Sequence, residues 1–233
     1  MMLALPAAVG AMTLKIFPVL ILLPPEEPVQ TMTVENGGEA NARVQVRVLA
    51  WHQENGEDVF TETRDVLANP AQFEVMPGAQ QLIRFGSRTP QEQSERSYRV
   101  FLEEVPTGGP RAPGEVQTLL RISVPIFVPG KEQIGKLDWK AWPSGAGKVT
   151  VAIRNQGTTH IHFNRFGVSR GGKLLGQQDM SVYLLPGATR QVQLDVSAPV
   201  RAGERLKFDA LAGEAKLSAD LVSQAGPDEN GRS

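Results

Sequence analysis

Apolar and polar residues alternate along much of this chain. In ARVQVRVLAW (Ala42–Trp51), every second residue from Ala42 onward is apolar, and arginine or glutamine fills the first positions between them. Successive side chains of a β-strand point to opposite faces, so this pattern is typical of an antiparallel strand with one buried face. The segment therefore predicts a strand that packs its valines on a core.

Further segments alternate in the same way or are rich in β-branched residues, and turn residues separate them. They are Gln30–Val34, Gln81–Phe85, Tyr98–Val105, Val116–Val128, Lys148–Arg154, His160–Val168, Arg190–Val196 and Leu206–Leu211. No stretch of a dozen residues shows the 3.6-residue period of a capped helix. Many short strands with regularly spaced turns predict an all-β fold of the sandwich type.

An internal repeat divides the chain into two parts. VMPGAQQLIRF (Val75–Phe85) returns as LLPGATRQVQL (Leu184–Leu194), and residues 31–51 are echoed by residues 148–168 as a strand, an asparagine-containing turn and another strand. The repeat predicts two tandem immunoglobulin-like β-sandwich domains, at 12–130 and 131–222. The polar tail 223–233 has almost nothing to bury, so we expect it to be disordered.

The N-terminus suggests export. MMLALPAAVGA (residues 1–11) is a short apolar run that ends in small residues, as at a signal-peptidase site, and we interpret it as a remnant or truncated signal peptide. A membrane helix over residues 3–23 is not expected, because Lys15, Pro6 and Pro18 interrupt the run and Pro24 follows it. The prediction is an exported protein without an integral membrane segment.

Composition and charge exclude several classes of function. The formal net charge is −1, with 41% hydrophobic and 21% charged residues, which gives no electrostatic reason to expect nucleic acid as a partner. The chain has no cysteine, so disulfides, thiol nucleophiles and cysteine metal sites are excluded. A soluble globular protein is expected.

The motifs of common enzymes are missing from the sequence. There is no nucleophile elbow, phosphate-binding glycine loop, zinc-protease helix or dinucleotide fingerprint. His160 and His162 would share one face of a strand and could present two imidazoles to a metal, but no third ligand is evident nearby. We therefore expect no enzyme activity, no cofactor and no metal site.

One segment has no echo in the other half. A loop, Thr107–Gly114, leads into the long predicted strand Val116–Val128, which is apolar on much of both faces. Its first nine residues, 116–124, at about 3.3 Å each already span about 30 Å, longer than an ordinary sandwich strand. The segment is either the last strand of the first domain or a surface that binds a partner by its edge.

The chain resembles the periplasmic pilus chaperones of the chaperone–usher pathway, a PapD-like family of two immunoglobulin-like domains set in an L. The similarity covers about residues 13–222 and is carried by VQVRVLAWHQENGED (44–58), NPAQFEVMPGAQQLIRF (69–85), SYRVFLEEVP (97–106), LLRISVPIFVP (119–129), and NQGTTHIHF with LLPGATRQV in the second half. The segment SVPIF is more similar to the divergent, archaic-type subclass that serves spore-coat-U-like subunits than to the well-known adhesive-pilus subclass.

The resemblance implies a chaperone function in the periplasm. Members bind pilus subunits whose immunoglobulin-like fold lacks its last strand, donate a strand with alternating apolar side chains to the open groove, and deliver the subunits to an outer-membrane usher. Here the donated strand would be about 116–124, and its donated face would be Val116, Thr118, Leu120 and Ile122.

The resemblance has one departure. In better-known members a basic pair binds the C-terminal carboxylate of the subunit, and an ungapped comparison places Leu20 and Val124 at those positions. Arg121 and Lys15 are the nearest basic residues and are the anchor candidates, although a shift of register would explain the difference equally well.

Two alternatives from other classes remain open on the sequence alone. The first is a secreted structural or adhesive tandem β-sandwich module, since sandwich folds serve many functions. Aromatic residues make up only 6% of the chain, which argues against a sugar-binding surface. The second is a metal-dependent enzyme that uses His160 and His162.

Overall fold

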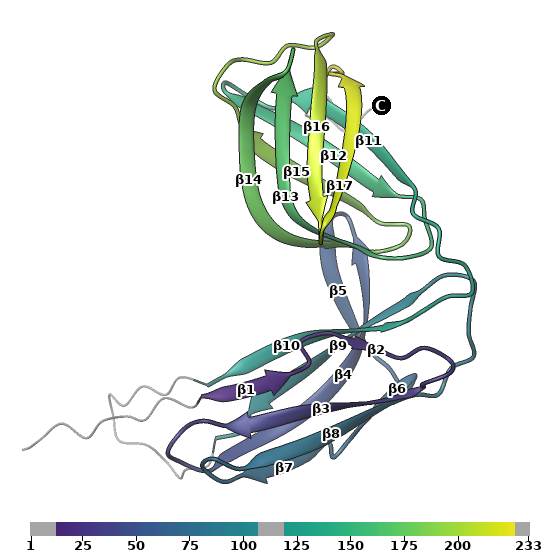
Figure 1. Cartoon of the computed structure of the whole chain (residues 1–233), viewed down its shortest axis with the longest axis vertical. Coiled ribbons are helices and arrows are strands. Elements are labelled where there is room, and N and C mark those ends of the chain that lie inside the picture. Colours follow the sequence, from purple (N-terminus) through teal and green to yellow (C-terminus); the bar gives the residue numbers. More distant parts are fainter. Residues whose placement is uncertain (1–12, 107–118, 227–233) are drawn as a thin grey trace, which may run out of the picture. The chain divides into compact units, whose positions relative to one another are not determined.

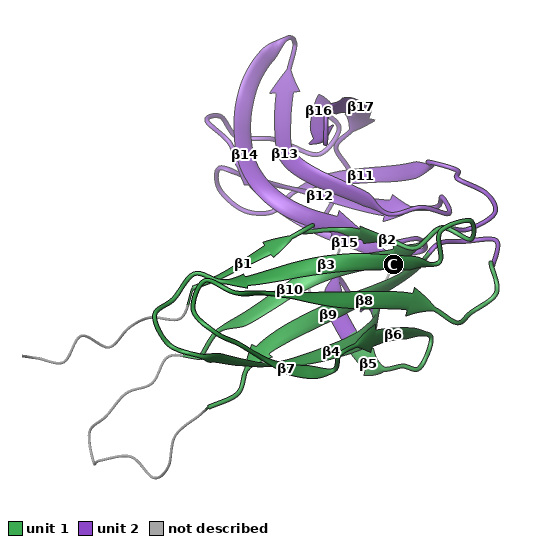
Figure 2. Cartoon of the chain, turned by 60° about the horizontal axis from the view of Figure 1, so that its bottom comes forward, with its two compact units in different colours: residues 1–51, 60–91, 96–129 green, residues 52–59, 92–95, 130–233 purple. Residues whose placement is uncertain are grey.

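The computed structural model describes residues 13–106 and 119–226, and the described part consists of strands, turns and loops (Figure 1). Contacts divide the chain into two compact units (Figure 2). The first comprises residues 1–51, 60–91 and 96–129, and the second comprises 52–59, 92–95 and 130–233. The boundaries predicted for the two domains, at 12–130 and 131–222, stay a prediction.

Two sheets form most of the first unit, and the hairpin at 52–59 that extends one of them belongs to the second unit. One has the order β1 (Leu14–Phe17), β3 (Val29–Asn36), β8 (Gln80–Ser87), β6 (Val66–Asn69). The other has the order β2 (Ile21–Leu22), β10 (Arg121–Val128), β9 (Arg96–Glu104), β4 (Ala42–Glu54), β5 (Glu57–Glu62), and β7 (Gln72–Val75) also pairs with β4. Apart from the parallel pair of β2 and β10, the described pairs of both sheets are antiparallel.

The alternation in β4 determines which of its side chains enter the core. Ala42, Val44 and Val46 are buried, whereas the residues between them are exposed. These valines pack in one cluster with buried residues of both sheets, among them Met32, Ile83, Phe85, Tyr98, Val100, Val124 and Ile126. The predicted half-buried strand is confirmed, and it extends three residues beyond Trp51.

Two sheets also form the second unit. The order β11 (Leu137–Pro143), β12 (Lys148–Asn155), β15 (Thr189–Asp195) makes one sheet, and β14 (Lys173–Leu184), β13 (Ile161–Arg170), β16 (Arg205–Ala212), β17 (Ala215–Val222) makes the other. Buried residues line the space between them, including Val149, Val151, Ile153, Phe163, Phe166, Val168, Leu194 and Phe208. The strand predicted to start at His160 starts at Ile161, so only His162 of the two histidines lies on it.

The sequence repeat corresponds to two turns that are each built around a buried asparagine. Asn36 ends β3 and is fully buried; its side-chain amide donates to Val75 O at 3.0 Å and to Ala40 O at 2.7 Å. Its Oδ1 accepts from Gly38 N at 2.9 Å. The main chain of Asn36 is also bonded to the Pro-Gly-Ala turn, through Gly78 N at 2.8 Å and Ala79 O at 3.1 Å.

Asn155 repeats these bonds in the second unit. It ends β12, is fully buried, and donates to Leu184 O at 3.1 Å and Thr159 O at 2.7 Å. Its Oδ1 accepts from Gly157 N at 2.9 Å, and its main chain is bonded to Gly187 N and Ala188 O, both at 2.9 Å. Each Pro-Gly-Ala segment is therefore a turn, and one buried asparagine at the end of a strand is hydrogen-bonded to it.

Among the described residues, no helix is both long and apolar enough to cross a membrane.

Candidate functional site

Strand β10, the described part of the long segment without an echo, has one open side. It pairs with β9 along its whole length, from Arg121 opposite Glu103 to Val128 opposite Arg96. On its other side β2 pairs only with Ile126 and Phe127. Within residues 13–106 and 119–226, no strand pairs with β10 on this side ahead of Ile126.

The register determines which main-chain groups face the open side. Glu104 N donates to Leu120 O at 2.9 Å, so the even-numbered residues of this segment are bonded to β9. In an antiparallel ladder the intervening residues point the other way, which directs the N–H and C=O of Arg121 and Ser123 to the open side. Phe127 O, which accepts from Leu23 N at 2.9 Å, follows the same alternation. This edge can accept an additional strand.

The side chains of the even-numbered residues face the core of the first unit. Val124, Ile126 and Val128 are buried, while Ile122 is only partly buried against the same cluster and Leu120 is half-buried. The other two residues of the predicted donated face, Val116 and Thr118, lie outside the described residues. The apolar row is thus buried from Val124 onward and partly exposed at Leu120 and Ile122.

The odd-numbered side chains ahead of Pro125 face away from the core, whereas Pro125 and Phe127 themselves are buried. Leu119 is 47% exposed, and Arg121 and Ser123 are also exposed. Arg121 is held in place on this face: its Nε lies 3.0 Å from Glu103 Oε1, and its guanidinium lies 4.3 Å from the centre of the Phe101 ring.

Glu103 joins three strands through two arginines. Besides Arg121 of β10, it accepts two hydrogen bonds from Arg47 of β4, at 2.9 and 3.1 Å, and this contact raises the pKa of Arg47. Two guanidiniums thus share the Glu103 carboxylate, and a second carboxylate, Glu104, accepts a hydrogen bond from Leu120 N at 3.1 Å. Glu103 and Arg47 were not singled out from the sequence; their alternation on adjacent strands was visible, but their pairing required the register.

Lys15, the other anchor candidate, lies on β1 and pairs with β3. Its Nζ is 2.8 Å from Glu35 Oε1, and this bond lowers the pKa of the Glu35 carboxyl. Lys15 and Arg121 belong to different sheets, and no described contact joins them. At the positions of the expected basic pair, Leu20 is half-buried and Val124 is 2% exposed.

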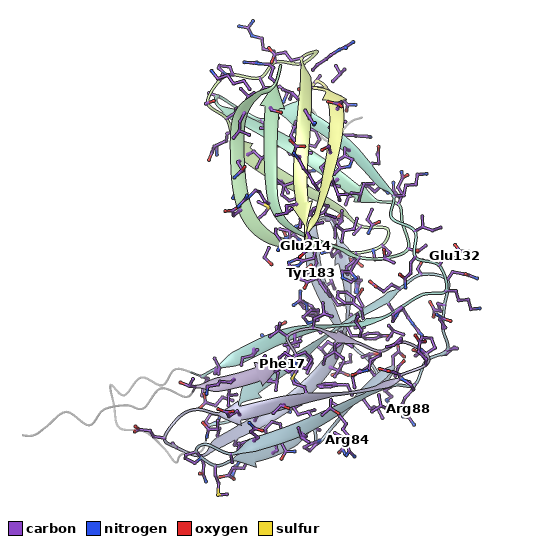
Figure 3. The ribbon with its side chains drawn as sticks, in the orientation of Figure 1. Phe17, Arg84, Arg88, Glu132, Tyr183 and Glu214 are labelled. Atoms are coloured by element: carbon purple, nitrogen blue, oxygen red, sulfur yellow. The ribbon has the colours of Figure 1, made fainter. Side chains whose placement is uncertain are left out.

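Strand β1 contributes a second partly covered apolar row. Leu14 and Ile16 are partly buried against the same core cluster as Ile122. Phe17, labelled in Figure 3, ends the strand with a side chain that is 77% exposed. The short alternation of LKIF was the signal for these residues, and the prediction of strands missed it.

The two histidines considered as metal ligands are engaged in other contacts. His160 Nδ1 lies 2.7 Å from Glu95 Oε1, and the His162 ring stacks on Tyr183 with ring centres 4.1 Å apart. No group of three or more histidine, aspartate or glutamate side chains that could hold a metal ion occurs in the described part of the chain.

Comparison with known proteins places the chain in a family. The sequence model of the family described as pili and flagellar-assembly chaperone, PapD N-terminal domain, matches residues 13–131. No curated protein sequence matches the chain.

Solved structures share the fold over nearly the whole chain. One is the CsuC–CsuE chaperone–tip adhesion subunit pre-assembly complex from archaic chaperone–usher Csu pili of Acinetobacter baumannii, with 18% identity, a TM-score of 0.67, and 92% of this chain and 99% of that chain covered. Another is the Salmonella enterica SafA pilin in complex with the SafB chaperone, with 16% identity, a TM-score of 0.59, and 92% of this chain and 99% of that chain covered. A third is the E. coli chaperone DraB, with 15% identity, a TM-score of 0.58, and 90% of this chain and 99% of that chain covered.

At these identities the likeness shows the fold alone, and it confirms the predicted all-β, immunoglobulin-like architecture. The family match covers the two sheets of the first unit and the whole of β10. This chain therefore belongs to the pili and flagellar-assembly chaperones, with a PapD N-terminal domain over residues 13–131.

Proposed function

We propose that this protein is a periplasmic chaperone that binds incomplete immunoglobulin-like pilus subunits through the open edge of β10 and delivers them to an outer-membrane usher. The observation that carries the proposal is the open side of β10 between Arg121 and Pro125. The matched structures include chaperone–subunit complexes, the CsuC–CsuE and SafA–SafB pairs. Binding of this kind uses no catalytic residue, and we assign the protein no enzyme activity.

Main-chain hydrogen bonds supply the first part of the affinity. A strand added to the open edge satisfies the N–H and C=O groups of Arg121 and Ser123, as in other cases of β-augmentation. An exposed edge is otherwise prone to unwanted pairing, so its retention is consistent with a binding role.

Apolar side chains supply the second part. We assign the donated face to Val116, Thr118, Leu120 and Ile122, and the partial exposure of Leu120 and Ile122 supports this assignment. A partner that covers such a side chain gains at most about 1.5–3 kcal/mol for each one fully buried. Since Ile122 already contacts the core of its own domain, its further gain is smaller than that of Leu120.

The carboxylate anchor is assigned to Arg121, with Lys15 as the second candidate. Arg121 lies next to the open edge, and it shares the Glu103 carboxylate with Arg47, so its guanidinium has capacity left to bind a negative group of the subunit. Lys15 is already bonded to Glu35, which lowers its value as an anchor.

Opposite faces of one strand provide the test. The chaperone is coexpressed with a secreted spore-coat-U-like subunit that lacks its last strand, and the subunit recovered with the chaperone is measured. Leu120→Asp should reduce recovery at least tenfold, because it places a charge in the apolar row. Leu119→Asp, which adds the same charge on the other face, should leave recovery within twofold.

Unfolding midpoints of the purified variants show that each one still folds. Equal recovery with both variants would contradict the assignment of the donated face. Arg121→Ala is compared at low and high salt: we expect weaker binding at low salt only, and an unchanged affinity at both would remove Arg121 as the anchor.

A further inference from the structure

The second unit carries a trough that the chaperone function described above does not use. Strands β14, β13, β16 and β17 form a sheet whose outer face turns away from β11, β12 and β15 (Figure 1). Along β13 the outward positions are Arg165, Gly167 and Ser169, followed by Gly171 at the hairpin. Residues with small or absent side chains thus occupy the centre of this face.

Larger side chains on the neighbouring strands make the walls. Gln177 and Leu174 of β14 stand on one side of Gly167 and Ser169, and Asp209 and Lys207 of β16 stand on the other. The trough contains two hollows, of about 260 Å³ around Gly167 and about 610 Å³ between Ser169 and Val222. From residue 165 to 171 it is about 20 Å long, at about 3.3 Å per residue.

Apolar side chains are exposed along the trough. Leu174 and Val222, at its two sides, are 57% and 56% exposed. None of the residues that line the two hollows is aromatic, so the trough lacks the stacking platform that a sugar-binding surface would need. Apolar groups beside a hollow one or two side chains wide suit an extended peptide.

The charges of the trough are unevenly compensated. Near Gly167 the charges are paired: Arg165 binds Asp179, and Asp209 accepts from Ser218 at 2.6 Å and lies 3.5 Å from Lys216. Burial alone would raise the pKa of Asp209, but Ser218 and the nearby lysines lower it overall.

At the other end Arg205 and Lys207 project from β16, and in the described part of the chain no carboxylate lies within ion-pair distance of either. Asp220 faces Lys207 across the strand pair without reaching it. This end of the trough therefore attracts negative charge.

We propose that this trough binds an extended segment of a partner protein that places an apolar side chain over Gly167 and a carboxylate near Lys207 and Arg205. The described end of the chain is bonded to the other sheet, where Gln224 N donates to Ala141 O of β11 at 2.8 Å. Opposite charge at one end would set the direction of the bound segment.

Gly167 allows the trough to be filled without strain. A Cβ at this position would lie 3.8 Å from Gly176 O and 3.9 Å from Leu174 Cδ1, which are ordinary contacts, and its φ is not in the left-handed region. Valine is also favoured in strands. Gly167→Val should therefore preserve the fold and occupy the first hollow.

The probe is a fluorescein-labelled peptide, Thr-Val-Thr-Leu-Thr-Leu-Thr-Glu-Glu, titrated with the full chain and followed by fluorescence anisotropy. Because the open edge of β10 can also accept a strand, every titration is repeated with Leu120→Asp present. We expect saturable binding that Gly167→Val and Lys207→Glu each weaken at least tenfold, and that a Lys-Lys ending in place of Glu-Glu weakens to the same extent.

Matched controls are Gln191→Val on β15 and Lys140→Glu on β11, which make the same kinds of change on the other sheet and should leave the affinity within twofold. Binding that is lost with Leu120→Asp but kept with Gly167→Val would overturn the proposal. The proposal would also be overturned if the protein did not bind the peptide and instead bound vesicles of anionic phospholipid through Lys207.

Discussion

The two asparagine-anchored turns have the same hydrogen bonds and different surroundings. Asn36 and Asn155 each hold one Pro-Gly-Ala turn, and even the next residue repeats its bond: Gly37 N donates to Thr13 O and Gln156 N to Lys136 O, both at 2.7 Å. A short sequence phrase thus encodes the same local structure twice. What differs is the chain that lies around each turn.

The second turn is enclosed by segments of its own unit. Thr158 Oγ1 accepts from Ile134 N at 2.8 Å and donates to Glu132 O at 2.7 Å, and Glu95 N donates to Thr158 O at 2.9 Å. Gly157 is buried beneath them. Within the described residues, Glu39, which corresponds to Thr158, is exposed and has no such bonds. The same asparagine anchor therefore occurs in a turn that is exposed and in a turn that other segments of its unit cover.

Removing Asn36 or Asn155 should cause the largest loss of stability, and the loss should be similar in the two variants. Asn36→Ala and Asn155→Ala each delete three side-chain hydrogen bonds and leave buried carbonyl groups without donors, so we expect a loss of about 3–5 kcal/mol of unfolding free energy in each case. Urea unfolding measures the loss, and hydrogen exchange of β3 and β12 shows which unit has opened. A loss below about 1 kcal/mol in either variant would mean that the shared bonds are not the anchor.

Adding one methyl group to each turn should change stability by different amounts. In Gly157→Ala the new Cβ would lie 2.1 Å from Ile134 O and 2.9 Å from Lys136 N, both main-chain atoms, so we expect a loss of about 2–3 kcal/mol. Gly37→Ala meets nothing closer than 3.5 Å and should stay within about 0.5 kcal/mol. Equal thermal shifts for the two variants would contradict the contrast between an enclosed and a bare turn.

The smallest effect tests what the turns share. Gly78 and Gly187 have φ values of +72° and +78°, and nothing lies within 4 Å of a Cβ added to either. Alanine in this conformation costs about 1 kcal/mol, so Gly78→Ala and Gly187→Ala should lower stability by that amount and to the same degree. Urea midpoints check this, and a difference above about 1 kcal/mol would show that the turns are not equivalent.

Local patterns predicted much of this fold because they depend on neighbouring residues. The alternation of Ala42–Trp51 and the repeated Pro-Gly-Ala phrase both read directly as structure, and the asparagine of each repeat was visible as part of a turn. Strand β14 was missed, since the polar run Gln177–Asp179, Gly176 and two register shifts interrupt the alternation. Its role is determined by pairing with β13, which no local pattern encodes.

The candidate site was predictable only in part, for the same reason. The sequence identified the segment around β10 as unusual, and it offered Arg121 as an anchor. That Arg121 shares Glu103 with Arg47, and that Ile122 packs against its own core, both follow from the register of three strands that are far apart in the chain. Such contacts require the fold.

Pro125 determines where any complex on this edge must end. It has no N–H to offer, and β2 occupies the edge from Ile126 onward, so the hydrogen-bond ladder of a bound strand stops ahead of this residue. The same limit prevents two copies of this protein from pairing along the whole of β10, which discourages aggregation through this edge.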